Sequence, residues 1–171
     1  MNGAELVSDA NVAAFSASVP GTFPHMSRAD SRVWRAFMSV SPVPLDDVVY
    51  DLGVGGKAAN RIPDTDELKV MWKTLTRKRI DAVIIRPDYV LACEVKPLAN
   101  MSALGQALTY AYLLNHSTSF TVTAWPCVVA GRVDDDVEEV FLNYGVLVFL
   151  VSGSKPGESP RLEKVLGPLP R

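Results

Sequence analysis

The stretch that decides the fold is residues 77–114, RKRIDAVIIRPDYVLACEVKPLANMSALGQALTYAYLL. It contains two apolar runs, Arg79 to Ile85 and Tyr89 to Lys96. The turn signal Arg86-Pro87-Asp88 separates them, so the pattern predicts a β-hairpin. Ser102 then opens a helix that is expected to run to about Leu114.

Charged side chains interrupt this predicted hairpin at positions that face each other. Strand alternation places Glu94 and Lys96 on one face. With Pro87-Asp88 as the loop, the register places Asp81 directly opposite Glu94. Opposed residues have Cβ atoms about 4.5–5.5 Å apart, where two like charges destabilise a sheet unless something compensates them. A divalent cation would compensate, because Mg²⁺ prefers carboxylate oxygens.

A metal site is therefore expected at the hairpin, with Mg²⁺ (or Mn²⁺) held by Asp81, Glu94 and the backbone carbonyl of Val95. Lys96 would lie beside this site, where it could position a water or balance charge on a phosphate. Such an arrangement suits hydrolysis of phosphodiester bonds. The alternative interpretation of the three charged side chains is a salt-bridge cluster on the surface.

The helix after the hairpin carries a polar pair that could face this site. Gln106 and Tyr110 are spaced i, i+4 and share one side of the helix. Leu104, Leu108 and Ala111 are expected to form its apolar side. The alternative for the polar pair is an ordinary interfacial position on an amphipathic helix.

The remaining elements surround the hairpin and its helix. Ser27 is expected to cap a helix ending near Val40, with Asp30 as its capping-box partner. The other expected elements are a strand at Asp46 to Gly53, a strand at Phe120 to Ala130, a short helix at Asp134 to Asn143 and a strand at Val146 to Val151. Their order is α-β-β-β-α-β-α-β. Residues 1–26 are expected to form an N-terminal arm and residues 152–171 a C-terminal tail, which would order against a partner or a second subunit.

Charge and composition restrict the function. Lys and Arg total 17 and Asp and Glu total 19, so the net charge of −2 excludes a globally basic coat protein. Locally, however, a basic segment precedes Asp81 and could contact phosphates. The candidate nucleic-acid-binding residues are Lys57, Arg61, Lys73, Arg77, Lys78 and Arg79. Trp72, in the same segment, is expected in the core, with stacking on a nucleic-acid base as the alternative.

Two further features of the sequence are uninformative about chemistry. A second Glu-x-Lys, Glu67-Leu68-Lys69, lies in a polar stretch that is typical of a solvated helix start. Cys93 and Cys127 lie in apolar runs, which predicts buried, reduced thiols. No run is long enough to cross a membrane, and no export signal is evident, so we expect a cytoplasmic protein, or one of the host cytoplasm or virion if it is viral.

Asp81, Glu94-Val95-Lys96 and Gln106-Ala-Leu-Thr-Tyr110 together resemble the PD-(D/E)XK nuclease superfamily. The Gln-x-x-x-Tyr element is similar to that of its RecB-like branch, which includes small phage-type members. The resemblance covers about Ser27 to Ala130. It implies an α/β, restriction-endonuclease-like core of α-β-β-β-α-β order, with a mixed four- to five-stranded sheet flanked by helices. Residues 27–151 would form this nuclease-like domain.

The resemblance also implies roles for individual residues. Asp81 and Glu94 would bind the metal, Lys96 would be the catalytic lysine, and Gln106 and Tyr110 would support the active site. Asp30 would match the acid that the family often carries on its first helix, although that acid is more usually Glu; the alternative for Asp30 is a capping residue only. Ile80 stands where the name of the motif would place Pro.

The function expected from the resemblance is metal-dependent hydrolysis of DNA, with RNA as an alternative substrate because a site centred on phosphate does not choose between sugars. The alternative from another class is a structural or assembly protein, such as a virion component, that retains the fold with a vestigial or binding-only site.

Overall fold

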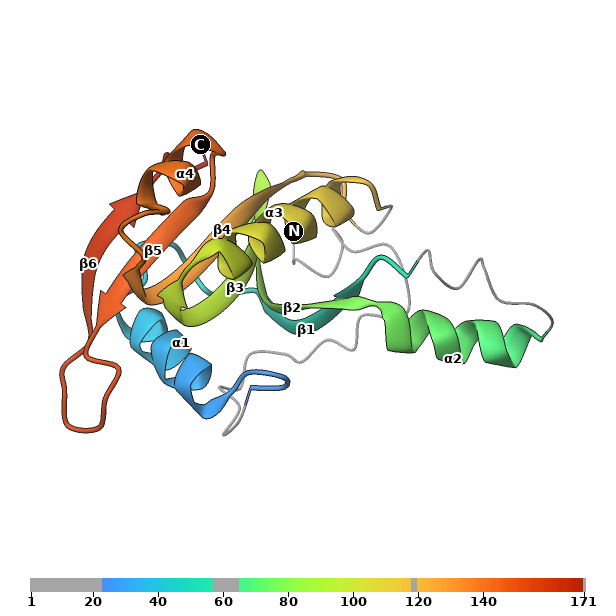
Figure 1. Ribbon diagram of the computed structural model, residues 1–171, viewed down its shortest axis with the longest axis horizontal. Coiled ribbons are helices and arrows are strands. Elements are labelled where there is room, and N and C mark those ends of the chain that lie inside the picture. The colour runs from blue at the N-terminus through green and yellow to red at the C-terminus, as the bar shows by residue number, and fades with distance from the viewer. Residues whose placement is uncertain (1–22, 57–64, 118–119, 171) are drawn as a thin grey trace.

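A mixed sheet of six strands forms the centre of the protein (Figure 1). The structure is a computed structural model that describes residues 23–56, 65–117 and 120–170, apart from the side chains of residues 73 and 74. The strands are β1 (Val48–Val54), β2 (Lys78–Ile85), β3 (Tyr89–Ala99), β4 (Thr123–Val133), β5 (Leu147–Ser152) and β6 (Arg161–Leu166). The helices are α1 (Arg28–Val40), α2 (Asp66–Thr76), α3 (Met101–Asn115) and α4 (Glu138–Asn143).

The strands lie in the sheet in their order along the chain. The pairs β1·β2, β2·β3 and β5·β6 are antiparallel, whereas β3·β4 and β4·β5 are parallel. Each parallel step is connected by a helix, α3 for the first and α4 for the second, because parallel strands require a long crossover. The protein is therefore an α/β fold, as expected.

The β2–β3 hairpin has the register that the sequence predicts. Ala82 pairs with Cys93 and Ile85 with Val90, so the same register places Asp81 opposite Glu94. The backbone N–H of Arg86 donates to the carbonyl of Tyr89 at 2.9 Å and closes the turn.

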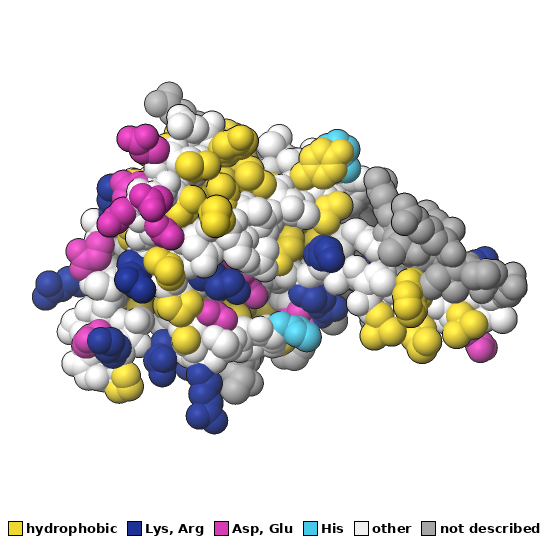
Figure 2. Space-filling view, in the orientation of Figure 1, with side chains coloured by type: hydrophobic (Ala, Val, Ile, Leu, Met, Phe, Trp, Pro, Cys, Tyr) yellow, Lys and Arg dark blue, Asp and Glu magenta, His cyan; other side chains and the backbone are white. Residues whose placement is uncertain are grey.

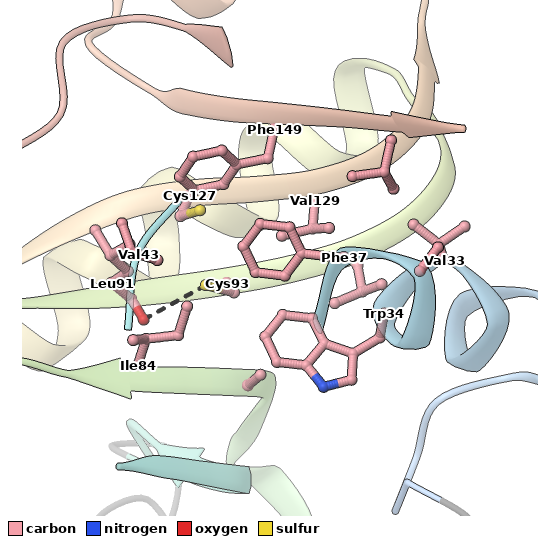
Figure 3. Close-up of a cluster of buried hydrophobic side chains, with 14 of the residues drawn as sticks. Val33, Trp34, Phe37, Val43, Ile84, Leu91, Cys93, Cys127, Val129 and Phe149 are labelled. Atoms are coloured by element: carbon pink, nitrogen blue, oxygen red, sulfur yellow. Dashed lines mark hydrogen bonds between the residues drawn. The ribbon is translucent and has the colours of Figure 1, made fainter. Parts of the chain in front are cut away.

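Helices cover both faces of the sheet. On one face, α1 buries Trp34 and Phe37 against sheet residues that include Cys93 and Phe149 (Figure 3). The Phe37 and Phe149 rings lie 5.0 Å apart between centroids. The opposite face is covered by α3 and α4 (Figure 1). Their cores include alternate residues of the same strands, such as Val90 and Ala92, which confirms the predicted strand alternation.

Cys93 and Cys127 are free and fully buried, as predicted. They are register neighbours on β3 and β4 in the core under α1, and the Cys93 thiol lies 3.7 Å from the carbonyl oxygen of Leu91 (Figure 3). No helix in the described ranges is long and apolar enough to span a bilayer.

The side of α3 that contacts the sheet differs from the predicted one. Its buried residues are Ala103, Ala107, Tyr110, Ala111 and Leu114, while the larger Leu104 and Leu108 are only partly buried. Small alanine side chains let the helix backbone approach the sheet closely, so the alanines, and not the leucines, form the contact between α3 and the sheet. The helix is also capped by Asn100, two residues before the expected Ser102, because the Asn100 side chain accepts from the N–H groups of Ser102 and Ala103.

Two further segments of the chain differ more strongly from expectation. Residues 161–166, expected within a tail, form β6, which pairs with β5 and brings the sheet to six strands instead of four or five. The polar helix start at residues 65–69 continues into α2, which the expected element order lacks. Trp72 lies on this helix with 41% of its surface exposed, so its predicted core position was wrong.

Candidate active site

The Glu94 carboxylate is the most unusual polar group in the described part of the chain. Glu94 is only 1% exposed, and Lys96 Nζ lies 2.7 Å from its Oε1. Neither carboxylate oxygen has a well-formed hydrogen bond within the described residues, so the ion pair with Lys96 is the contact that holds the group. Burial raises the pKa of Glu94 to about 7, with repulsion from Asp81 adding to the effect and Lys96 opposing it. The site therefore holds a carboxylate that is poorly satisfied when ionised.

Asp81 lies across the hairpin from Glu94 and is held by the backbone. Its Oδ2 accepts a hydrogen bond from the N–H of Val95 at 2.9 Å. Burial raises the pKa of Asp81 to about 6, opposed by the Val95 hydrogen bond and the Lys96 charge. The acids Asp30 and Asp51 raise it further. The two carboxylates thus act on each other across adjacent strands, as the register predicts.

Lys96 remains a cation in this environment. Burial lowers the pKa of the Lys96 ammonium, but the contact with Glu94 and the charges of Asp81 and Asp30 outweigh burial, so the net shift is upward. About a third of its side chain is exposed. Lys96 is therefore suited to act as a charge and hydrogen-bond donor, and not as a base at neutral pH.

Asp30 has the capping role that the sequence offered as one of two alternatives. Its Oδ2 accepts from the N–H of Ser27 at 3.0 Å, and its own N–H donates to the Ser27 hydroxyl at 3.1 Å. Asp30 is also 8% exposed and close enough to raise the pKa of both Asp81 and Glu94. The capping box therefore places a third acid, Asp30, near Asp81 and Glu94, and its Oδ2 is already bound to the N–H of Ser27.

The polar pair on α3 is hydrogen-bonded within the helix, and its Tyr110 is influenced by the same acids. Gln106 Nε2 donates to the Tyr110 hydroxyl at 3.1 Å, and the Ser102 hydroxyl donates to Gln106 Oε1 at 3.1 Å. Burial raises the pKa of Tyr110, the Gln106 hydrogen bond opposes this, and the charges of Glu94 and Asp81 raise it further. Tyr110 thus lies near enough to the hairpin acids for their charges to act on its hydroxyl, and hydrogen bonds on the same helix link it to Gln106 and Ser102.

Asp51 is an acid of this region that the sequence did not indicate. It lies opposite Asp81 in the β1–β2 register, and its φ of 56° is a left-handed conformation that Asp tolerates better than most residues. Both Asp51 oxygens accept from the Arg79 guanidinium, and His25 Nε2 lies 3.3 Å from Oδ2. The available signal was an acid two residues before Gly53, which ends a β-rich run, but the strand assignment gave no reason to single out Asp51.

The candidate nucleic-acid-binding residues are only partly described. Lys57 and Arg61 lie outside the described residues, and the side chain of Lys73 is likewise not described. Lys78 is exposed, Arg77 is half-buried, and Arg79 is held by Asp51. Figure 2 shows basic side chains mixed with acidic ones across this face instead of forming a uniform positive surface.

The donor set of the site fits a hard divalent cation. No group of three or more Asp, Glu, His or Cys side chains within the described ranges is arranged to hold a metal ion. Asp81 and Glu94 nonetheless offer carboxylate oxygens, and Oε2 of Glu94 is buried without a partner in the described chain, whereas Oε1 contacts Lys96. Mg²⁺ binds through one or two carboxylates and keeps several waters, so two protein carboxylates suffice.

Comparison with known proteins identified no matching family model, no matching curated protein and no matching solved structure. The chemistry of the site must therefore be argued from its own residues.

Proposed function

We propose that this protein is a metal-dependent nuclease of the PD-(D/E)XK type, with a restriction-endonuclease-like core, that hydrolyses DNA phosphodiester bonds. One observation carries the proposal: the Glu94 carboxylate is almost fully buried, and only its Oε1 has a contact in the described chain, the ammonium of Lys96, while Oε2 has none. Glu94 also lies opposite Asp81 on the neighbouring strand. Proteins rarely leave a buried carboxylate in this condition unless a ligand completes it. The positions of Lys96, Gln106 and Tyr110 support the same interpretation.

Asp81, Glu94 and the Val95 carbonyl are the groups that would hold Mg²⁺ or Mn²⁺. When bound, such a cation supplies Lewis-acid polarisation of a phosphate and lowers the pKa of a bound water. Asp30 adds negative potential beside these groups, which favours a divalent cation over a monovalent one. The region is thus acidic where a cation would bind and basic where Lys96 emerges toward solvent.

The chain's own residues supply the rest of the chemistry. Lys96, held by Glu94, presents a fixed ammonium that can hydrogen-bond a phosphate oxygen and stabilise the negative charge that develops during hydrolysis. Gln106 fixes the orientation of the Tyr110 hydroxyl, which borders the acids. Lys78 and Arg77, at the start of β2, are placed to contact the nucleic-acid backbone.

The test combines metal binding and cleavage. Calorimetric titration of the protein with Mn²⁺ is expected to show binding that Asp81→Asn and Glu94→Gln abolish. Incubation with plasmid, single-stranded DNA and single-stranded RNA, with Mg²⁺ or EDTA, is expected to show metal-dependent cleavage that Lys96→Met reduces at least a hundredfold without loss of Mn²⁺ binding. Glu139→Gln makes the same chemical change at an exposed position outside the site and should leave both readouts unchanged. Cleavage that persists in the Asp81 and Lys96 variants would refute the assignment.

A structural or assembly protein with a binding-only site is the second candidate. The observation that favours it is the exposed apolar side of α2, which is typical of a protein that associates. Mn²⁺ binding without cleavage of any of the three nucleic acids would favour this function over nuclease activity.

A further inference from the structure

The helix α2 carries an exposed apolar stripe away from the candidate active site. Leu68, Met71, Trp72 and Leu75 have the spacing i, i+3, i+4, i+7, which puts them on one side of a helix. Their exposed fractions are 46%, 51%, 41% and 69%. Figure 1 shows α2 extending away from the sheet, and Figure 2 shows hydrophobic side chains gathered along it.

This helix is unusual because the apolar side that would normally pack in a core is exposed in the described part of the chain. Helices of fewer than about 12–15 residues are marginally stable alone in water, and most helices depend on packing of their apolar side. Helix α2 has 11 residues, and no helix or strand in the described ranges covers its stripe. The side chains that would normally stabilise such a helix are therefore available to a partner.

The charges at the two ends of α2 identify the partner that fits. Asp66 and Glu67 lie in its first turn, and Arg77 and Lys78 follow its last residue. A second copy of the same helix, packed antiparallel, places the acids of each copy at the basic end of the other. The two helix dipoles also point in opposite directions in this arrangement, so the positive end of each lies beside the negative end of the other.

We propose that α2 is a homodimerisation helix, whose apolar stripe packs antiparallel against the same stripe of a second copy of the chain. The two-fold axis passes between Met71 and Trp72, so Leu68 of one copy meets Leu75 of the other. The apolar stripe contains none of the proposed metal-binding or catalytic residues, although Arg77 and Lys78 at its basic end are also proposed nucleic-acid contacts. The helix is about 16 Å long, so the contact is smaller than a standard interface of about 1,600 Å², and we expect a dimer that dissociates on dilution.

Sedimentation velocity of the full chain over a wide concentration range tests the proposal. The wild type should shift from monomer to dimer, and Leu75→Asp should weaken the dimer at least tenfold. Val70→Asp is the matched control, because Val70 is 67% exposed on the opposite side of the same helix and should leave the dimer intact. Circular dichroism of both variants checks that they remain folded. A wild type that stays monomeric, or a dimer that Val70→Asp disrupts as strongly as Leu75→Asp, would overturn the proposal.

Cross-linking supplies a second measurement that does not depend on a destabilising charge. Cys93 and Cys127 are fully buried, so a cysteine placed on α2 is the reactive thiol among the described cysteines. Met71→Cys lies next to the proposed axis and should give a disulfide-linked dimer under mild oxidation, whereas Val70→Cys should remain monomeric. Equal cross-linking of both variants would show that α2 does not pair in this way. Neither experiment uses nucleic acid or metal, so failure of the dimer leaves the nuclease proposal to its own test.

Discussion

Asp81 Oδ2 accepts the backbone N–H of Val95 at 2.9 Å, so the acid of β2 is fastened to β3 at the residue that follows Glu94. This bond holds two carboxylates together although burial and mutual repulsion oppose their ionisation. The pKa of Asp81 is raised to about 6 and that of Glu94 to about 7, chiefly by burial. The site is thus arranged at the expense of stability, as expected where charges are kept for binding and not for folding.

Glu94→Gln is therefore expected to stabilise the metal-free protein. At pH 8 the substitution removes a buried charge that lacks adequate partners, and Lys96 is exposed enough to be solvated alone. We expect a gain of about 1 kcal/mol in the free energy of unfolding, measured by urea denaturation in EDTA, together with loss of Mn²⁺ binding. Glu139→Gln, the exposed control, should change stability by less than about 0.5 kcal/mol. A Glu94→Gln protein that is less stable than the wild type would mean that the ionised carboxylate has partners beyond Lys96.

The stability of the metal-free protein should depend on pH in a defined direction. Both folded-state pKa values lie above the ordinary values of 3.8 for Asp81 and 4.5 for Glu94. Their contribution to stability is therefore complete below about pH 4 and is lost as the pH rises through about 6 and 7. Each unit of pKa shift corresponds to about 1.4 kcal/mol, so these values correspond to a loss of stability of up to about 4 kcal/mol between pH 5 and pH 8.

Urea unfolding in EDTA at a series of pH values measures this effect. The double variant Asp81→Asn/Glu94→Gln isolates the pair from every other titrating group, because the difference between the two pH profiles belongs to these residues. Mg²⁺ added at pH 8 should restore stability to the wild type and not to the double variant. Parallel pH profiles for the two proteins would contradict the raised pKa values.

The central hairpin and the first helix could be predicted from local patterns because each depends on short-range rules. The turn at Pro87-Asp88 fixes the register, and the Ser27–Asp30 capping box fixes the start of α1. By contrast, β6 could not be predicted, because half of residues 161–166 are charged and the segment forms a strand through pairing with β5 at the sheet edge. An edge strand needs few apolar residues, so its sequence resembles that of a tail.

Within the candidate site, too, the residues that could be predicted are those whose positions follow from short-range rules. Asp81 and Glu94 follow from register, and Gln106 and Tyr110 from helical spacing. Asp51 does not, because its position depends on a left-handed backbone conformation within a strand. The buried side of α3 was mispredicted for a related reason: close helix–sheet packing favours small alanines over the leucines that a hydrophobicity pattern selects.

Substitutions at Asp51 should separate backbone strain from ion pairing. Asp51→Ala removes both contacts to Arg79 and places Ala at a φ of 56°, so we expect a loss of about 2 kcal/mol. Asp51→Asn tolerates the same φ and keeps one acceptor for Arg79, so it should lose about 1 kcal/mol or less. Urea denaturation at pH 7 measures both variants.

Asp46→Ala provides the control for this comparison. Asp46 also pairs with an arginine, Arg86, at 3.4 Å, but its side chain is 84% exposed. Exposed pairs contribute little, so this variant should lose less than about 0.5 kcal/mol. If Asp51→Ala were as mild as Asp46→Ala, the strained conformation and the Arg79 contacts would have no structural importance.

Alanine substitutions in the loop before β6 should show whether this strand is firmly attached. Gly153 and Gly157 both have left-handed backbones, with φ of 72° and 85°. A Cβ on Gly153 would lie 2.1 Å from the carbonyl oxygen of Ser159, whereas a Cβ on Gly157 would meet nothing within 4 Å.

Gly157→Ala should therefore cost about 1 kcal/mol from conformation alone. Gly153→Ala should cost at least about 2 kcal/mol more, because the backbone that leads into β6 must move. Since 1 kcal/mol corresponds to about 2–4 °C at this chain length, thermal unfolding resolves the two variants, and equal melting temperatures would mean that β6 is not held against β5 by this loop.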